Sequence, residues 1–186
     1  TLRDGVLRYI SHGGAFGSGA INLEGGRLFT NQDFSARVSS ISAGATAVVD
    51  TVGNVNATAA MVGDGGVTKL GGNTLSLIAN GPNSTGTFKG ALTIGGGSVQ
   101  LVTASGANAL SAGKDLRFID APVATGVGSA VGQLRLLMTT TGHLFSPTNP
   151  QETVSQQFGK LSLAGGEAQL LFNNRVNLST PTSTAT

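Results

Sequence analysis

Two segments of this chain repeat each other about 24 residues apart, and this repeat limits the possible folds more than any other feature. The segment Gly71-Gly72-Asn73-Thr74-Leu75-Ser76-Leu77 aligns with Gly95-Gly96-Gly97-Ser98-Val99-Gln100-Leu101. The same offset aligns Val67-Thr68-Lys69-Leu70 with Ala91-Leu92-Thr93-Ile94. Each repeat therefore contains two short stretches of alternating apolar and polar residues, which is typical of β-strands with one buried face.

Similar alternation occurs in short segments along much of the chain. The clearest examples lie at 6–10, 20–23, 116–118, 134–136, 161–163 and 175–178. The composition disfavours helices, because 29 of the 186 residues are glycine and a glycine costs about 1 kcal/mol relative to alanine inside a helix. Hydrophobic residues make up 39% of the chain and charged residues only 11%, so the chain is apolar enough to fold.

A period of about 24 residues that contains strands and no helix predicts an all-β fold. We expect a right-handed parallel β-helix, or β-solenoid, with about 20–25 residues per coil. Equivalent residues of successive coils would stack about 4.8 Å apart, with Leu75 on Val99 and Leu77 on Leu101. A β-sandwich is the alternative, but it predicts hairpin turns and no fixed coil period.

Residues 1–178 are expected to form a single solenoid module. Within it, the regions 104–132 and 139–151 are rich in small residues or proline, and we expect loops or longer excursions from a coil there. Residues 179–186 are expected to be a linker or a strand that continues into a neighbouring repeat. The residues predicted to point into the interior are Leu75, Leu77, Ile94, Val99, Leu101, Phe118, Leu161 and Leu163.

Residues 65–77 resemble the autotransporter-associated β-strand repeat of bacterial autotransporter passengers. That family reads G-x-L-x-K-x-G-x-G-x-L-x-L, and this chain follows it with Val67 in place of the usual leucine and Asn73 in place of the third glycine. Phe88 stands where the family has the aromatic residue of the next turn, and the resemblance extends over 41–102. It implies a parallel β-helix that is exported to the bacterial cell surface.

Histidines and cysteines give no sign of a catalytic or metal site. His12 and His143 are the only histidines, and neither lies in a nucleophile or zinc-binding motif. The chain has no cysteine, which excludes disulfides, thiolate metal sites and cysteine nucleophiles. We therefore predict no catalytic, cofactor-binding or metal-binding residues, no cofactor, and no enzymatic activity.

Carboxylates need a closer test, because a β-helix can also carry the acid pair of a polysaccharide lyase or hydrolase. Asp115 and Asp120 are the nearest pair, and on an extended strand they point to opposite faces. Stacked coils could still bring Asp33, Asp50 or Asp64 together. A carbohydrate-active enzyme is therefore the alternative function, and a phage fibre or spike segment is a further one.

The charge distribution argues against a nucleic-acid partner. The formal net charge is only +2, and the closest basic cluster, Lys114 with Arg117, alternates with acidic residues. No apolar run approaches the roughly 18 residues that cross a bilayer, so we expect no membrane insertion by this segment.

We expect a structural or adhesive module of a secreted or cell-surface protein. Strand-like alternation at 6–10 and 175–178 leaves both ends without a recognisable polar cap. The ends are therefore expected to meet neighbouring repeats, or copies of the same chain head to tail in a layer or fibre. Host-cell or matrix glycans are the expected adhesive partners.

Overall fold

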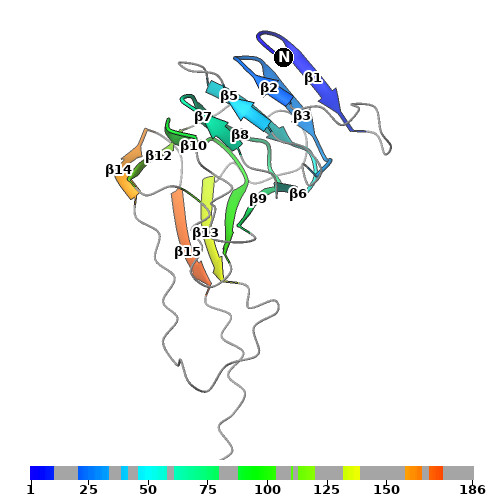
Figure 1. Cartoon of the computed structure of the whole chain (residues 1–186). Coiled ribbons are helices and arrows are strands. Elements are labelled where there is room, and N and C mark those ends of the chain that lie inside the picture. Colours follow the sequence, from blue (N-terminus) through cyan, green and yellow to red (C-terminus); the bar gives the residue numbers. More distant parts are fainter. Residues whose placement is uncertain are drawn as a thin grey trace, which may run out of the picture.

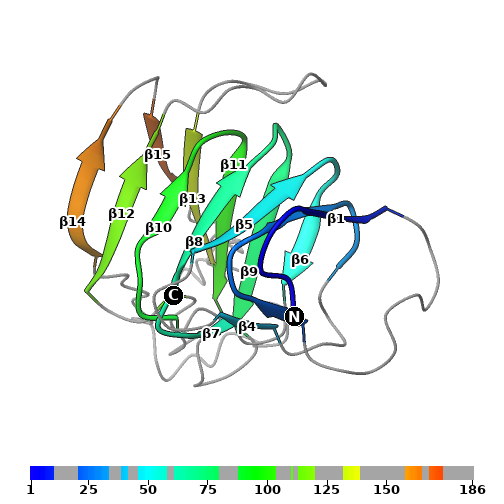
Figure 2. The same cartoon turned by 90° about the horizontal axis from the view of Figure 1, so that it is seen from above.

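The strands of this chain form three parallel sheets around a common interior, in the computed structural model shown in Figures 1 and 2. The structure describes residues 1–10, 21–33, 39–41, 46–57, 61–79, 88–103, 110, 113–119, 132–138, 158–164 and 168–173. All the secondary-structure elements within these ranges are β-strands, and no helix there could cross a membrane. The prediction of an all-β parallel solenoid is confirmed.

The large sheet has seven strands and extends along the whole solenoid. Its order is β1 (Val6–Tyr9), β3 (Arg27–Thr30), β5 (Thr46–Thr51), β8 (Gly66–Leu70), β10 (Leu92–Ile94), β12 (Lys114–Phe118) and β14 (Phe158–Leu163). Because each strand pairs in parallel with the next, equivalent side chains lie in rows that cross all the coils.

Two smaller sheets complete the walls. The second sheet has the order β15 (Ala168–Asn173), β13 (Gly132–Met138), β11 (Ser98–Thr103), β9 (Thr74–Ala79) and β6 (Val55–Ala57). The short sheet contains β2 (Ile21–Leu23), β4 (Ser39–Ile41) and β7 (Met61–Gly63). Figure 2 shows the large and second sheets facing each other across the interior.

The strand pairing gives the length of each coil. As far as β12, successive strands of the large sheet are about 20–25 residues apart, as in the pairs Val6–Arg27 and Leu92–Leu116. The next pair, Leu116–Leu161, is 45 residues apart. This longer coil contains 139–151, which lies outside the described residues, as does 179–186. Strand β12 lies inside the other expected excursion, 104–132.

Six of the eight residues predicted to be interior are buried. Val99 pairs with Leu75 and Leu101 with Leu77, as the repeat predicted. The six are Leu75, Leu77, Ile94, Val99, Leu101 and Phe118.

The predicted burial of Leu161 and Leu163 is wrong. Their side chains are 49% and 66% exposed, although they pair with the buried Leu116 and Phe118 and so belong to the inward rows. The physical reason is their place in the sheet, because β14 is its last strand among the described residues and no described strand follows to cover them.

The offset read from the repeat is correct for the second sheet but one residue short for the large sheet. Val67 pairs with Leu92, which is the residue after the expected Ala91. The difference arises at the corner where the chain passes from the large sheet to the second sheet. Four residues separate Lys69 from Thr74 there, but only three separate Ile94 from Ser98. A shift of one residue exchanges the two faces of a strand, so Lys69, and not Leu70, shares an inward row with Ile94.

Candidate functional site

Lys69 is a lysine inside the solenoid. It lies on β8 between Val49 of β5 and Ile94 of β10, which are both fully buried. The Lys69 side chain is itself 0% exposed. An ammonium group in such surroundings is strongly unfavourable unless hydrogen bonds replace its lost hydration.

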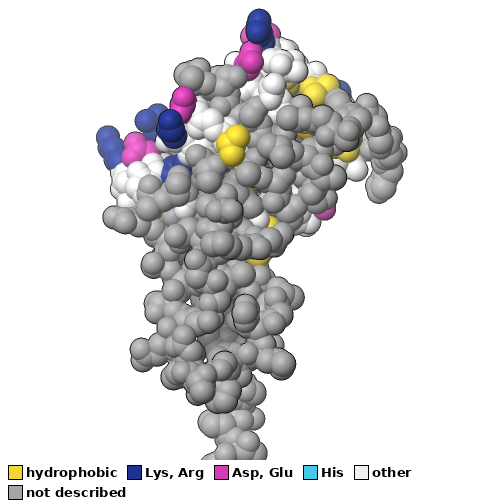
Figure 3. All heavy atoms as spheres, in the orientation of Figure 1, with side chains coloured by type: hydrophobic (Ala, Val, Ile, Leu, Met, Phe, Trp, Pro, Cys, Tyr) yellow, Lys and Arg dark blue, Asp and Glu magenta, His cyan; other side chains and the backbone are white. Residues whose placement is uncertain are grey.

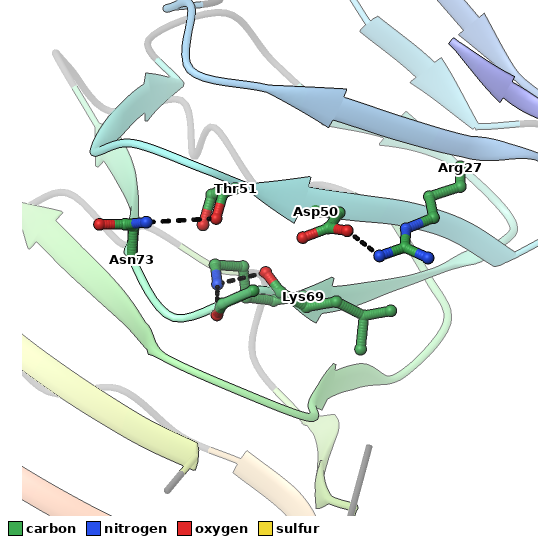
Figure 4. Close-up of polar contacts among 7 residues, drawn as sticks. Arg27, Asp50, Thr51, Lys69 and Asn73 are labelled. Carbon is green, nitrogen blue, oxygen red and sulfur yellow. Dashed lines mark hydrogen bonds and ion pairs between the residues drawn. The ribbon is translucent and has the colours of Figure 1, made fainter. Parts of the chain in front are cut away.

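Three carbonyl oxygens supply those hydrogen bonds, and Figure 4 draws part of this set. The Nζ of Lys69 donates to the carbonyl oxygens of Leu70 at 2.6 Å, Gly71 at 2.8 Å and Gly96 at 3.1 Å. An ammonium group has three protons to donate, so its donors are fully used. Leu70 and Gly71 belong to the corner of one coil and Gly96 to the corner of the next, so Lys69 joins two coils.

The carboxylate of Asp50 lies beside this corner and is also buried, at 1% exposure. Its Oδ2 forms an ion pair with the Nη2 of Arg27 on the preceding coil (Figure 4). Within the part of the chain that the structure describes, three buried side-chain polar atoms have no hydrogen-bond partner: Asp50 Oδ1, Arg27 Nε and Thr51 Oγ1. The corner is therefore a polar region within a largely apolar wall.

Burial changes the protonation of the lysine. Desolvation lowers the pKa of Lys69 to about 7, and the nearby negative charge of Asp50 only partly opposes this change. Near neutral pH, the amine of Lys69 is therefore poised between its charged and neutral forms.

Glycine makes the close approach at this corner possible. Gly71 has a φ of 78°, and a Cβ there would overlap the carbonyl oxygen of Thr51 and the Oδ1 of Asp50. Gly97 has a φ of 62°, and a Cβ there would likewise overlap the carbonyl oxygens of Asn73 and Gly71. Both glycines combine a left-handed backbone with direct contact between coils.

Lys114 on β12 is a second buried lysine, 4% exposed. Its Nζ donates to the carbonyl oxygen of Phe88 and lies 3.9 Å from the centre of the Phe88 ring. Such a position over an aromatic face stabilises a cation, whereas desolvation lowers the pKa of Lys114 to about 8. The backbone of Phe88 is held in turn by a 3.0 Å hydrogen bond from its N–H to the carbonyl oxygen of Met61.

Polar contacts nearer the surface also join neighbouring coils. The Oδ1 of Asn54 accepts a hydrogen bond from the N–H of Thr74 at 3.2 Å. The hydroxyl group of Thr74 is 2.8 Å from that of Ser98 one coil further on. Arg3 and Glu24 form an exposed ion pair at 2.6 Å.

The carboxylates considered as a catalytic pair have separate partners. Asp33 accepts a 2.7 Å hydrogen bond from the N–H of Asn56, and Asp64 pairs with the Nζ of Lys89 at 2.5 Å. Asp50 pairs with Arg27 as described above.

The remaining candidate residues divide between the described and the undescribed parts of the chain. Asp115 accepts a 2.9 Å hydrogen bond from the N–H of Lys160, whereas Asp120, His12 and His143 lie outside the described residues. Among the described residues, no group of three His, Cys, Asp or Glu could hold a metal ion.

The two buried lysines were missed in the sequence because a lysine within an alternating strand normally indicates the solvent face. The signal that could have identified Lys69 is the residue aligned with it, since an offset longer by one residue places the apolar Ile94 there. Both lysines donate hydrogen bonds to backbone carbonyl oxygens, and these hydrogen bonds join neighbouring coils. No family model, curated protein or solved structure was found to match this chain.

Proposed function

We propose that this chain is a structural module of a secreted or cell-surface β-solenoid protein, in which it acts as a stiff scaffold. The observation that carries the proposal is the cross-linking of coils by two buried lysine side chains. Lys69 holds the carbonyl oxygens of two successive corners, and Lys114 holds Phe88 of the coil before it. Sliding or separating these coils would leave buried amines and carbonyl groups unpaired, which is costly.

Two further features support the proposed location and partners, respectively. The first is the resemblance of residues 41–102 to the autotransporter-associated repeat. The second is the surface, where basic and acidic side chains are intermixed on the face drawn in Figure 3 rather than gathered into a basic patch. The proposed partners are therefore sister repeats and extracellular glycans, and not nucleic acid.

Stiffness can be tested with spin labels, because the chain has no cysteine of its own. Labels on Arg3→Cys and Lys160→Cys, two exposed positions, report the distance between the ends of the large sheet. A matched shorter pair, Arg3→Cys with Thr93→Cys, ends on β10 instead of β14. We expect both pairs to give one narrow distance distribution of the same width in double electron–electron resonance.

A hinged or loosely stacked chain would give a different result, since its distance distribution would broaden with the number of coils between the labels. That outcome would exclude the scaffold proposal. Release of reducing ends or unsaturated products from a panel of polysaccharides, if lost in Asp33→Asn, would instead establish the carbohydrate-active alternative.

A further inference from the structure

A buried carboxylate and two basic side chains from three consecutive strands lie close together at one corner of the solenoid. Arg27 is on β3, Asp50 on β5 and Lys69 on β8, and these strands are neighbours in the large sheet. Among the residues that the structure describes, Asp50 is the one acidic side chain that is buried. Figure 4 shows its carboxylate between Arg27 and the amine of Lys69. Three coils therefore bring ionisable groups to one place.

The two oxygens of the Asp50 carboxylate have different neighbours. Oδ2 forms the ion pair with the Nη2 of Arg27 on the preceding coil. Oδ1 has no hydrogen-bond partner and lies against Gly71 on the following coil, where a Cβ would overlap it. The carbonyl oxygen of Gly71 accepts one of the hydrogen bonds from Lys69, at 2.8 Å. The carboxylate thus bonds to Arg27 and lies beside a group that holds Lys69.

Asp50 is the titratable group that acts on Lys69 from the elements packed around it. Strand β10 on the other side of Lys69, and strands β9 and β11 across the interior, contain no acidic, basic or histidine residue. The corners at 71–73 and 95–97 contain none either. Because little water screens charges in a buried region, they attract each other over several ångströms. The charged form of Lys69 therefore depends on Asp50, and Asp50 is bound by Arg27.

We propose that Arg27 is a positioning residue for Lys69. By holding the Asp50 carboxylate toward the preceding coil, Arg27 limits the attraction between that carboxylate and the Lys69 ammonium group. Without Arg27, the carboxylate is free to turn both oxygens toward the corner that Lys69 holds. The proposal rests on the role of Lys69 as a cross-link between two coils, and it makes that cross-link depend on a side chain of a third coil.

NMR can follow the charge of Lys69 directly, because the chain contains only four lysines. Lysine labelled at Cε gives a signal for each of them, and the signal that is absent from Lys69→Met identifies Lys69. In the original chain we expect a titration midpoint near pH 7. In Arg27→Gln the midpoint should rise by about one pH unit, or tenfold in proton affinity, since Asp50 then has no other cation.

Two control variants separate positioning from other effects of substitution. Arg27→Lys keeps a cation beside Asp50, so the midpoint of Lys69 should stay close to its original value. Arg117→Gln removes an exposed arginine from β12, away from this corner, and should not change the midpoint.

The sharpest comparison is made without the carboxylate. Asp50→Asn should lower the midpoint, because the attraction is lost, and adding Arg27→Gln to Asp50→Asn should not raise it again. Neither of these chains contains an unpaired carboxylate at this corner, so both should fold even if Arg27→Gln alone does not. A midpoint that Asp50→Asn leaves unchanged, or that the added Arg27→Gln raises, would overturn the proposal. An Arg27→Gln midpoint equal to the original would also overturn it.

The outcome is independent of the stiffness experiment. A broad distance distribution between the spin labels would contradict the scaffold, whatever the midpoint of Lys69. A narrow distribution together with an unchanged midpoint in Arg27→Gln would leave the scaffold in place and exclude only the role of Arg27.

Discussion

Lys69 occupies an interior position that neighbouring coils fill with valine and isoleucine. Burial of the Val49 and Ile94 side chains stabilises the fold, because apolar surface leaves water. The Lys69 amine instead loses its hydrogen bonds to water, and three carbonyl oxygens replace them. The balance is visible in its pKa, which burial lowers to about 7. The charge state of one side chain thus contributes to how strongly two coils are held together.

We expect the free energy of unfolding to rise between pH 7 and 10.5. The pKa of Lys69 is about 7 in the folded chain and near 10.5 when unfolded. Between these two values the lysine is protonated in the unfolded chain but mostly neutral in the folded chain. This protonation stabilises the unfolded chain, and the stabilisation decreases as the pH rises. Below pH 7 the lysine is charged in both states and adds no pH dependence.

Urea unfolding at pH 7 and pH 9.5 measures this effect, with Lys69→Met and the exposed Lys160→Met compared with the original chain. The increase should be smaller in Lys69→Met and unchanged in Lys160→Met. Equal increases in all three chains would show that Lys69 keeps an ordinary pKa in the folded state.

Gly71→Ala should destabilise the chain more than Gly113→Ala. Both glycines have a left-handed backbone, with φ values of 78° and 75°, and alanine there costs about 1–2 kcal/mol. A Cβ on Gly113 meets nothing within 4 Å, whereas one on Gly71 overlaps the carbonyl oxygen of Thr51. Thermal melts of the two variants isolate the contribution of the contact, and equal losses would contradict it.

At the scale of the elements, the sequence was sufficient to predict several of the strands and one register, but it gave no sign of short strands such as β6 and β7. The repeat predicted Leu75 on Val99 because both coils use the same number of residues along the second sheet. It failed for Lys69 because an alignment without gaps cannot detect a corner that loses one residue. Corner length is set by glycine conformations and carbonyl contacts between coils, and neither is visible in an apolar–polar pattern.

Leu77 and Leu163 provide a test of how a strand's neighbours determine burial. Both have strand positions that face the interior, but Leu77 lies between two strands and Leu163 on the last described one. We expect Leu77→Asp to cost about 3–5 kcal/mol, since it buries an unpaired charge. Leu163→Asp should leave the melting temperature of dilute protein nearly unchanged, and comparable losses would contradict the assigned rows.

For the molecule as a whole, the sequence predicted the architecture but not the polar contacts between coils. Parallel stacking follows from a period of about 20–25 residues, which the strand pairing bears out as far as β12. The partner of each carboxylate could not be predicted, because Asp33, Asp50 and Asp64 meet residues one coil away in the sequence. Those partners depend on the length of each intervening corner.

The 45-residue coil between Leu116 and Leu161 has a practical consequence. The two leucines remain in one row although this coil is nearly twice as long as those before it. Coil length in this fold can therefore change with only a local irregularity in the strand pairing, between Lys114 and Leu116, as expected when the entropic cost of a longer connection grows only slowly. An epitope or a binding peptide grafted into 139–151 should be presented by a sheet whose own geometry does not change.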